Sequence, residues 1–296
     1  MKGTVCVVTG ATSGIGKAAA TALARQGATV VLVGRDRGRT GAVAAQIAAA
    51  GAASAASAAG AAGASPPRAE VADLASLEQV RALADRLAGL ERIDVLINNA
   101  GLMLGERRIT PDGLEHVFAL NHLAPFLLTN LLLPKLTASA PARVITVTSD
   151  AHSAARLDLR DPNLEHGWDS WRSYANSKLA NILFTRELAR RLDGTGVTAN
   201  CAHPGMVRTG FGRESRPLMK VGITIARPFM ASPERGADTI VYLASSPDVA
   251  GQTGGYYVKR QRREPSAAAR DDAVARELWE LSEEMTGLAP ARPTGN

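Results

Sequence analysis

The segment TVCVVTGATSGIG, residues 4–16, decides the fold. It opens with a short β-branched run, Thr4–Val8, and continues into a glycine-rich turn, Thr9–Gly16. Residues Lys17–Gln26 then have a helical composition, and Thr29–Val33 is again apolar and β-branched. This order of strand, turn, helix and strand predicts a βαβ unit, which implies a parallel sheet with a right-handed crossover.

The same alternation continues along most of the chain without a linker that would separate two cores. Runs such as Val30–Val33 and Val95–Ile97 are continuously apolar, as expected of strands that helices cover on both faces. We therefore predict an α/β fold, a single doubly wound Rossmann-type domain with a mostly parallel sheet flanked by helices. Further strands are predicted at Arg68–Val71, Ile93–Asn98, Arg143–Thr148, Val197–Ala202 and near Gly255–Val258, and further helices at Ser76–Leu90, Leu114–Leu136, Ser173–Arg191 and Pro233–Ala244.

The predicted domain covers residues 1–260, and residues 261–296 are predicted to form a C-terminal helical extension and tail. One stretch of the domain, residues 42–65, is almost entirely alanine with interspersed glycines and serines. Because alanine has the highest helix propensity, the first half is predicted to be helical, and the later glycines to fray it into a loop. A helix followed by a low-complexity insertion is favoured over a flexible interaction arm.

Composition excludes several classes of protein. The 296 residues include 34 Lys+Arg and 28 Asp+Glu, giving a net charge of +6. These basic residues are mostly scattered arginines, and the one cluster, 259–263, has no interleaved aromatics, so we predict no nucleic-acid binding.

Two cysteines and no secretory segment argue against a disulfide-built extracellular protein. Polar residues interrupt the longest apolar stretch, Leu120–Leu136, so no membrane span is predicted. The five histidines lack metal-ligand spacing, so no catalytic metal is predicted either.

The glycine-rich turn is the first candidate for a binding function. Glycines let backbone amides approach a pyrophosphate, and the N-terminus of the following helix offers unpaired N–H groups and a positive dipole end. Because the turn follows an apolar strand and opens a helix, it predicts a dinucleotide-binding site. The alternative is a tight turn without a ligand.

The end of the second predicted strand indicates which dinucleotide is bound. An acidic residue that binds the ribose hydroxyls is typical of NAD sites, whereas here Arg35 is the first residue with a side chain after Gly34. A guanidinium at that point pairs with a 2′-phosphate, which favours NADP(H). Asp36 follows one residue later and keeps NAD(H) as the less favoured alternative.

Tyr174 and Lys178 carry the strongest catalytic signal. On a helix, positions i and i+4 share a face, so the phenol and the ammonium are expected to line one site. The phenol of a free tyrosine has a pKa of about 10 and therefore exchanges protons poorly at neutral pH. A neighbouring ammonium favours the phenolate, and we therefore expect Lys178 to lower the pKa of Tyr174. Ser149 ends another apolar strand, at the sheet edge where ligands bind, and its hydroxyl is a candidate to hold a substrate carbonyl oxygen.

Together these residues resemble the classical short-chain dehydrogenase/reductase family. The motifs occur in the family's order over residues 3–258: Thr9-Gly10-x3-Gly14-Ile15-Gly16, Asp73-Leu74, Asn98-Asn99-Ala100-Gly101, Asn121, Ser149, Tyr174-x3-Lys178 and Pro204-Gly205. Within the family the chain is similar to the retinol-dehydrogenase and WW-domain-oxidoreductase branch, through Asn121–Leu123, Tyr174–Asn181 and Ala275–Leu288. It departs from that branch at Ala124-Pro125, where relatives often carry Gly-His and where a proline is expected to kink the helix.

The resemblance implies a role for each matched residue. Tyr174 would be the general acid in carbonyl reduction and the base in alcohol oxidation. Lys178 would lower the tyrosine pKa and bind the nicotinamide ribose. Ser149 would orient the substrate oxygen, and Asn121 would hold a water in a proton relay. Besides Tyr174 and Lys178, the implied cofactor-binding residues are Gly10, Thr12, Ser13, Gly14, Ile15, Gly16, Arg35, Asp73, Leu74, Asn99, Ala100, Gly101, Pro204, Gly205, Val207 and Thr209.

Two segments are candidates for the substrate site. Residues 206–230 include Phe211 and Phe229 and correspond to the segment that covers the substrate in this family. Trp168 and Trp171 precede the catalytic helix, and aromatic walls near a carbonyl site favour a bulky, apolar substrate. The alternative is that these tryptophans only pack their loop against the domain.

The leading hypothesis is an NADP(H)-dependent oxidoreductase that moves hydride between the nicotinamide and a carbonyl or alcohol carbon. A non-redox tailoring enzyme, such as a cyclase or dehydratase, and a dinucleotide-sensing regulator on the same fold are the alternatives. The regulator hypothesis predicts that some catalytic residues are missing. All four are present, namely Asn121, Ser149, Tyr174 and Lys178. The resemblance also implies a homo-oligomer, and the chain does not match the N-terminal membrane anchor of many vertebrate members, so a cytoplasmic location is expected.

Overall fold

A single sheet organises the protein. The structure is a computed structural model that describes residues 1–57, 66–207 and 230–288, and within these residues eight strands pair in the order β3-β2-β1-β4-β5-β6-β7-β8. All neighbours are parallel except β8, which runs antiparallel to β7. The strands are β1 (Val5–Thr9), β2 (Thr29–Gly34), β3 (Arg68–Val71), β4 (Val95–Asn98), β5 (Ala142–Val147), β6 (Val197–His203), β7 (Tyr256–Val258) and β8 (Gln261–Arg263).

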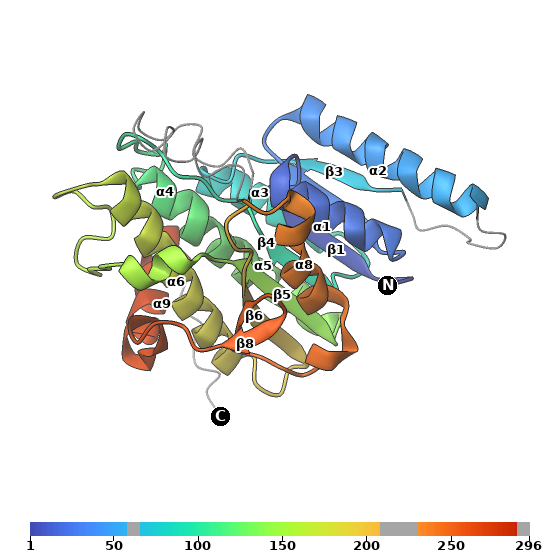
Figure 1. Cartoon of the computed structure of the whole chain (residues 1–296). Coiled ribbons are helices and arrows are strands. Elements are labelled where there is room, and N and C mark those ends of the chain that lie inside the picture. The colour runs from blue at the N-terminus through green and yellow to red at the C-terminus, as the bar shows by residue number, and fades with distance from the viewer. Residues whose placement is uncertain (58–65, 208–229, 289–296) are drawn as a thin grey trace.

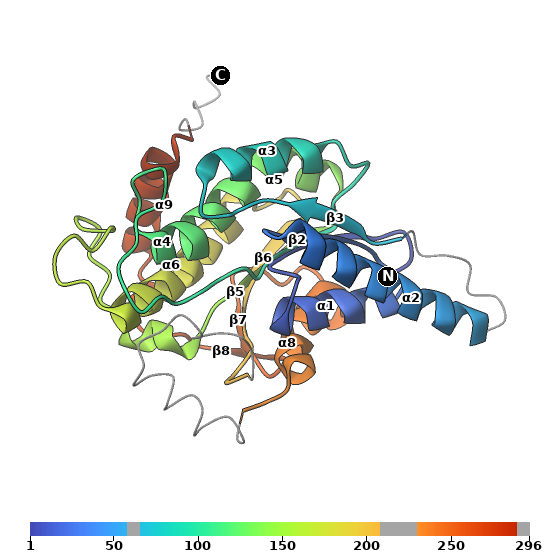
Figure 2. The same cartoon turned by 90° about the horizontal axis from the view of Figure 1, so that it is seen from above.

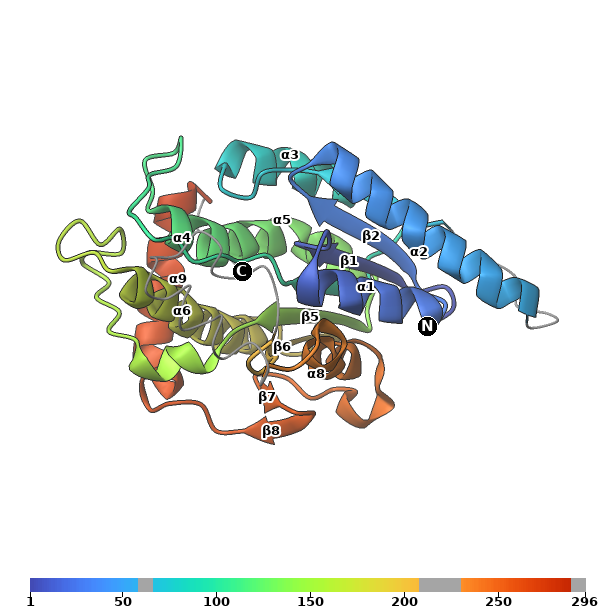
Figure 3. The same ribbon diagram turned by 45° about the horizontal axis from the view of Figure 1, so that its top comes forward.

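Helices cover both faces of this sheet (Figure 1). Seen from above, α3 and α5 lie on one face, while α1 and α8 lie side by side on the other (Figure 2). The long helix α2 accompanies α1 and runs past the edge of the sheet (Figure 3). The main helices are α1 (Gly14–Arg25), α2 (Arg37–Ser57), α3 (Leu77–Ala88), α5 (Ala124–Ala138), α6 (Ser170–Arg191), α8 (Pro233–Ser245) and α9 (Asp272–Thr286), the last packed against α6. The predicted doubly wound α/β fold is confirmed.

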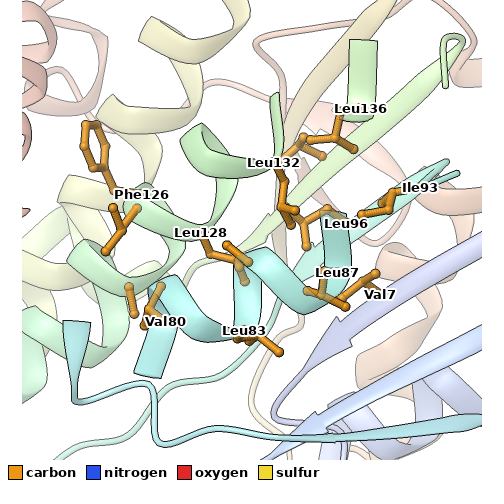
Figure 4. Close-up of a cluster of buried hydrophobic side chains, with 14 of the residues drawn as sticks. Val7, Val80, Leu83, Leu87, Ile93, Leu96, Phe126, Leu128, Leu132 and Leu136 are labelled. Carbon is orange, nitrogen blue, oxygen red and sulfur yellow. The ribbon is translucent and has the colours of Figure 1, made fainter. Parts of the chain in front are cut away.

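The core has one apolar layer on each face of the sheet. Strand β1 shows how the sequence divides between them, because Val7 points into one layer while Cys6 and Val8 point into the other. This is the two-residue alternation of a strand buried on both sides. In the first layer, leucines of α3 and α5 pack on Leu96 of β4 (Figure 4).

The topology places a crevice at one end of β1. This strand pairs with β2 on one side and with β4 on the other, so the chain changes side between β3 and β4. In open α/β sheets, ligands bind beyond the carboxyl ends of the strands at such a switch point. The residues that follow β1 and β4 are therefore placed to form a binding site.

The predicted helix Leu114–Leu136 is found as an unbroken helical run, His116–Ala138, that contains one irregular turn. It consists of a short helix α4 (His116–Phe118), a π-helical turn (Ala119–Leu123) and α5. Pro125 lies in the first turn of α5, immediately after the π-helical turn, and has no N–H to donate to the turn before it. The irregularity expected at the proline therefore takes the form of a π-helical turn immediately before it.

The run His116–Ala138 is long and apolar enough to cross a bilayer by length and composition, but 78% of its most apolar window is buried in the protein. That burial is typical of a core helix.

Two other segments differ from their predictions or extend beyond them. The basic cluster at 259–263 is exposed and contributes the turn and the edge strand β8, which was not predicted. The alanine-rich segment is helical as far as Ser57, at the end of α2, and its remainder, residues 58–65, lies outside the described residues. Most of the predicted substrate segment (208–229) and the end of the tail (289–296) also lie outside them.

Candidate active site

A cleft of about 1200 Å³ opens at the carboxyl ends of the parallel strands. Among the predicted site residues, Asn121 lies behind the cleft wall rather than in it, and Thr209 lies outside the described residues. The structure brings the others together in the cleft lining: Gly10, Thr12, Ser13, Gly14, Ile15, Gly16, Arg35, Asp73, Leu74, Asn99, Ala100, Gly101, Ser149, Tyr174, Lys178, Pro204, Gly205 and Val207.

The glycine turn at one end of the cleft is packed too closely for side chains. Gly10 has a φ of +65°, and a Cβ atom there would stand 2.9 Å from the Cα atom of Ala100. At Gly16, a Cβ atom would stand 2.4 Å from the carbonyl oxygen of Gly10. These positions therefore require glycine, and the turn exposes main chain to the cleft.

Asn99 holds this turn in place instead of pointing at a ligand. Its Nδ2 donates to the Thr9 carbonyl at 2.8 Å, and its backbone N–H donates to Thr9 Oγ1 at 3.0 Å. The backbone N–H of Ala100 donates to the same hydroxyl at 3.1 Å. The ends of β1 and β4 are thereby bound together, which fixes the floor of the cleft between the glycine turn and Gly101.

The N-terminus of α1 fits the pyrophosphate of a dinucleotide. The helix begins at Gly14, and Ser13 at its N-cap is extended and makes no side-chain capping bond. First-turn N–H groups lack intrahelical partners, and the positive end of the helix dipole lies with them. An anion at this point of the cleft lining would receive both contributions.

The cleft is basic beside the glycine turn, where the end of β2 lies against Ala11 and Thr12. Arg35 and Arg39 are exposed and line it, whereas the Asp36 carboxylate is not part of the lining. Asp36 Oδ1 instead accepts from the backbone N–H of Arg39 at 2.8 Å, which caps the start of α2. Arg39 was not predicted from the sequence, although its position four residues after Arg35, in the first turn of a helix, is a signal that could have identified it.

Tyr174 and Ser149 meet in the cleft lining. The Tyr174 hydroxyl is hydrogen-bonded to the Ser149 side chain. Ser149 caps the 3₁₀ helix Asp150–Ala154, where its Oγ accepts from the backbone N–H of Ala151 at 3.3 Å. Lys178 Nζ lies 5.5 Å from the centre of the tyrosine ring and donates to the Val147 carbonyl at 3.2 Å. Three side chains of the predicted catalytic set therefore adjoin one another.

The pKa values of this group correct one prediction. Burial raises the pKa of Tyr174 to about 12, against the opposing effect of its hydrogen bond with Ser149. Burial also lowers the pKa of Lys178 to about 8. The expected lowering of the tyrosine pKa by Lys178 is not found, because the ammonium is directed to the Val147 carbonyl and desolvation of the phenol dominates. Tyr174 is therefore a protonated phenol at neutral pH.

Asn121 braces the cleft wall from behind. Its Oδ1 accepts from the backbone N–H of Leu102 at 2.9 Å, and its Nδ2 donates to the Leu102 carbonyl at 2.9 Å and to Ser177 Oγ at 3.0 Å. Gly101, next to this contact, is close to both side chains, since a Cβ atom there would lie 3.3 Å from Lys178 Nζ and 3.4 Å from Asn121 Oδ1. Asn121 thus lies beside the lysine without facing the cleft.

The two loop tryptophans have different environments. Trp171 is 44% exposed and lines the cleft, with its ring centre 6.2 Å from that of Tyr174. The indole N–H of Trp168 donates at 3.1 Å to Glu115, a fully buried carboxylate. The aromatic-wall interpretation therefore describes Trp171, and the packing interpretation describes Trp168. Phe211 and Phe229 lie outside the described residues.

Sequence reasoning missed a polar pair on the other side of Ser149. His203 Nε2 lies 3.0 Å from Asp150 Oδ2, and the Tyr256 hydroxyl donates to Asp150 Oδ1 at 2.9 Å. Both His203 and Asp150 line the cleft. Their position immediately before Pro204 and immediately after Ser149 was the available signal. No group of three His, Cys, Asp or Glu side chains able to hold a metal ion occurs in the described ranges.

Comparison with known proteins agrees with this geometry. The family model described as short chain dehydrogenase matches residues 4–219. Retinol dehydrogenase 14 of Mus musculus is 44% identical over 295 residues, which cover 97% of this chain and 87% of that protein. A solved structure of an uncharacterized protein from Mycobacterium paratuberculosis has a TM-score of 0.76 and 35% identity, covering 97% of this chain and 94% of that one. The Pseudomonas aeruginosa RhlG/NADP active-site complex has a TM-score of 0.65 and 29% identity, covering 86% and 94%.

Proposed function

Because the chain belongs to the short-chain dehydrogenase family, and to its retinol dehydrogenase-like branch, we propose that it is an NADP(H)-dependent oxidoreductase that interconverts a carbonyl and an alcohol on a bulky, apolar substrate. The observation that carries this proposal is the contact of Tyr174 with Ser149 in the same cleft as the glycine turn. The cleft is therefore lined by the Tyr174 hydroxyl, the Ser149 hydroxyl and the glycine turn, so that one cleft can hold both a dinucleotide and a substrate.

The proposed chemistry assigns proton transfer to the protein. Bound NADPH would supply the hydride that the carbonyl carbon receives. The Tyr174 hydroxyl, protonated because its pKa is raised to about 12, donates its proton to the developing alkoxide. The Ser149 hydroxyl binds the same oxygen and orients it. In alcohol oxidation the steps reverse, and Tyr174 accepts the proton. Lys178 would hold the nicotinamide ribose, and Asn121 would place a water on the path to solvent.

The cofactor preference rests on the basic end of the cleft. Arg35 and Arg39 offer two guanidinium groups where the adenosine ribose would lie, and guanidinium forks match a phosphate. Asp36 Oδ1 accepts the capping bond of α2, and Asp36 is absent from the cleft lining, which favours the arginines as the groups that meet the ribose. A related structure, that of RhlG, was solved with NADP. We propose the remaining cofactor contacts for the predicted lining residues, with Asp73 at the adenine edge and Pro204-Gly205 beneath the nicotinamide.

The substrate class rests on the apolar mouth of the cleft. Among the described residues, Trp171 and Met206 are the exposed large apolar side chains that line it, 44% and 67% accessible, and the buried Met103 also lines the cleft. Exposed apolar surface next to a catalytic group is typical of a site for an apolar ligand. The name of the mouse relative, retinol dehydrogenase, indicates an apolar alcohol for that protein.

The tryptophan pair gives a matched test of the substrate class. Trp171→Ala is expected to raise KM for bulky apolar ketones about five- to tenfold, because part of an aromatic contact area is lost, with little change for small carbonyls. Trp168→Phe should leave KM unchanged but lower the melting temperature, because the buried Glu115 loses a hydrogen-bond donor. Steady-state kinetics and thermal melts separate the two effects. Equal KM changes in both variants would contradict a substrate contact at Trp171.

The experiment that tests the proposal as a whole is a panel of aldehydes, ketones and alcohols, each assayed with NADPH and NADH. We expect NADPH to be consumed in the presence of bulky apolar carbonyls. The loss of absorbance of the reduced nicotinamide measures this consumption. Substrate turnover without a lasting absorbance change would instead support the cyclase or dehydratase alternative. Tight dinucleotide binding without any turnover would support the regulator.

Three further predictions accompany this function. The catalytic domain is predicted to comprise residues 1–260, with residues 261–296 as its C-terminal extension. A homo-oligomer and a cytoplasmic location stay predictions from the family resemblance. The burial of the apolar run at 116–138 supports its interpretation as a core helix.

A further inference from the structure

We propose that Asn181, His122 and Ser282 are positioning residues: they form a one-way hydrogen-bond chain through which helix α9 fixes the main-chain carbonyl of Asn121 behind the catalytic lysine. The chain joins three elements that are far apart in sequence, α6, the π-helical turn and α9. The proposal rests on the catalytic function proposed above, and it extends that function to a helix that lies beyond the residues matched by the family model.

The first link exists because Pro125 follows Asn121 by four residues. In a regular helix, the N–H at that position would donate to the Asn121 carbonyl, and proline has none. Asn181 Nδ2 donates to that carbonyl instead, at 2.9 Å. Asn181 lies on the same face of α6 as Tyr174 and Lys178, because the three are spaced by four and three residues. Asn181 of α6 therefore supplies the hydrogen-bond donor that Pro125 lacks.

This first link determines the direction of the others. Since the Asn181 amide nitrogen must face the Asn121 carbonyl, its Oδ1 faces His122 Nδ1, 3.4 Å away. An oxygen there requires a proton on Nδ1, which leaves Nε2 of a neutral imidazole as an acceptor. Ser282 Oγ lies 2.9 Å from Nε2 and 2.7 Å from the Leu278 carbonyl, one turn earlier in α9. Its single proton can go to only one of these acceptors, and with Nδ1 protonated the chain requires that it go to Nε2. The protons thus run from Ser282 through His122 and Asn181 to Asn121.

The surroundings of His122 keep this chain intact. The ring is fully buried among Phe118, Phe126 and Phe184, with ring centres 5.0, 6.3 and 6.2 Å away. Burial lowers the pKa of His122 to about 4, so the imidazole is neutral under working conditions. An apolar cage of this kind offers no water in place of a lost partner, so each link depends on the next.

The consequence for catalysis follows from what Asn121 holds. Its side chain fixes both backbone groups of Leu102 in the cleft wall and contacts Ser177, the neighbour of Lys178 in α6. A shift of the π-helical turn would therefore move Asn121 relative to Lys178 and to the wall at Gly101. Loss of the chain is expected to lower kcat while leaving both KM values unchanged, because the ligand-contacting residues stay in place.

Two variants on the same helix separate positioning from packing. Ser282→Ala removes the hydroxyl at the start of the chain and is expected to lower kcat about fivefold, the effect of one hydrogen bond. Thr286→Val removes a buried hydroxyl that donates to the Ser282 carbonyl, outside the chain. That control should lose thermal stability and keep the wild-type kcat. Equal kcat values in Ser282→Ala, Thr286→Val and the wild type would overturn the proposal.

The tautomer of His122 provides a readout that does not depend on turnover. In a ¹⁵N NMR spectrum of the full-length protein, the imidazole is expected to carry its proton on Nδ1. In Ser282→Ala, the Nε2 signal should move toward that of an imine nitrogen without a donor. A proton on Nε2 in the wild type would overturn the chain whatever the enzyme reduces. Conversely, failure to reduce any carbonyl with the expected tautomer in place would count against the proposed function and not against the hydrogen-bond chain.

Discussion

The Tyr174→Phe variant is expected to lose carbonyl reduction by about 10²- to 10⁴-fold in kcat, the usual contribution of a positioned general acid. The reason is local, because the Tyr174 hydroxyl, in contact with Ser149 in the cleft lining, is the proposed proton donor. Tyr174 is 8% exposed, so phenylalanine should occupy the same space. Affinity for NADPH, measured by fluorescence titration, should change little because the glycine turn and the arginines are untouched.

The pH dependence of the wild type provides a control for this assignment. With a pKa of about 12, Tyr174 stays protonated through the neutral range. The rate of carbonyl reduction should therefore not fall in that range through loss of the tyrosine proton. Oxidation, which needs the phenolate, should accelerate with pH. A change near pH 8 is expected to report Lys178, whose ammonium loses its charge as pH rises through about 8. Retained reduction in Tyr174→Phe would reject the tyrosine as proton donor.

The fold was predictable because its signals are local. A continuous apolar strand, a glycine turn and a helix recur along the chain, and each can be identified within about ten residues. Strand β8 escaped prediction because Gln261–Arg263 is polar at every position and pairs only by its backbone with β7. The π-helical turn at Ala119–Leu123 escaped because an extra residue in a helical turn leaves the composition unchanged.

Most of the cleft lining was also predictable, since the glycine turn and Ser149 each follow a recognisable strand and Tyr174 lies on a recognisable helix. The sequence alone could not predict which partner each polar side chain binds by hydrogen bonds. Asn99 was expected beside the cofactor, and its side chain is bound to the glycine turn. The link between His122 and Ser282 joins residues 160 positions apart, which no local pattern reports.

The same point decides between the two dinucleotides at the end of β2, where the sequence offers Arg35 and Asp36 side by side. Asp36 accepts a backbone N–H of α2, and Arg35 lines the cleft. Arg35→Ala is therefore expected to weaken NADPH binding about ten- to a hundredfold, the worth of a charge-assisted hydrogen bond to a phosphate. NADH binding should change little, because that dinucleotide lacks the 2′-phosphate.

Arg37→Ala is the matched control, because Arg37 is an exposed arginine of the same segment that is absent from the cleft lining. It removes the same charge and so measures the long-range attraction alone, which salt screens over about 10 Å. Arg35→Ala should exceed it at every ionic strength, and the double variant Arg35→Ala, Arg39→Ala should bring NADPH and NADH to similar affinities. If Arg37→Ala weakened NADPH as much as Arg35→Ala, the effect would be general electrostatics. NADP(H) preference would then have no specific site at this end of the cleft.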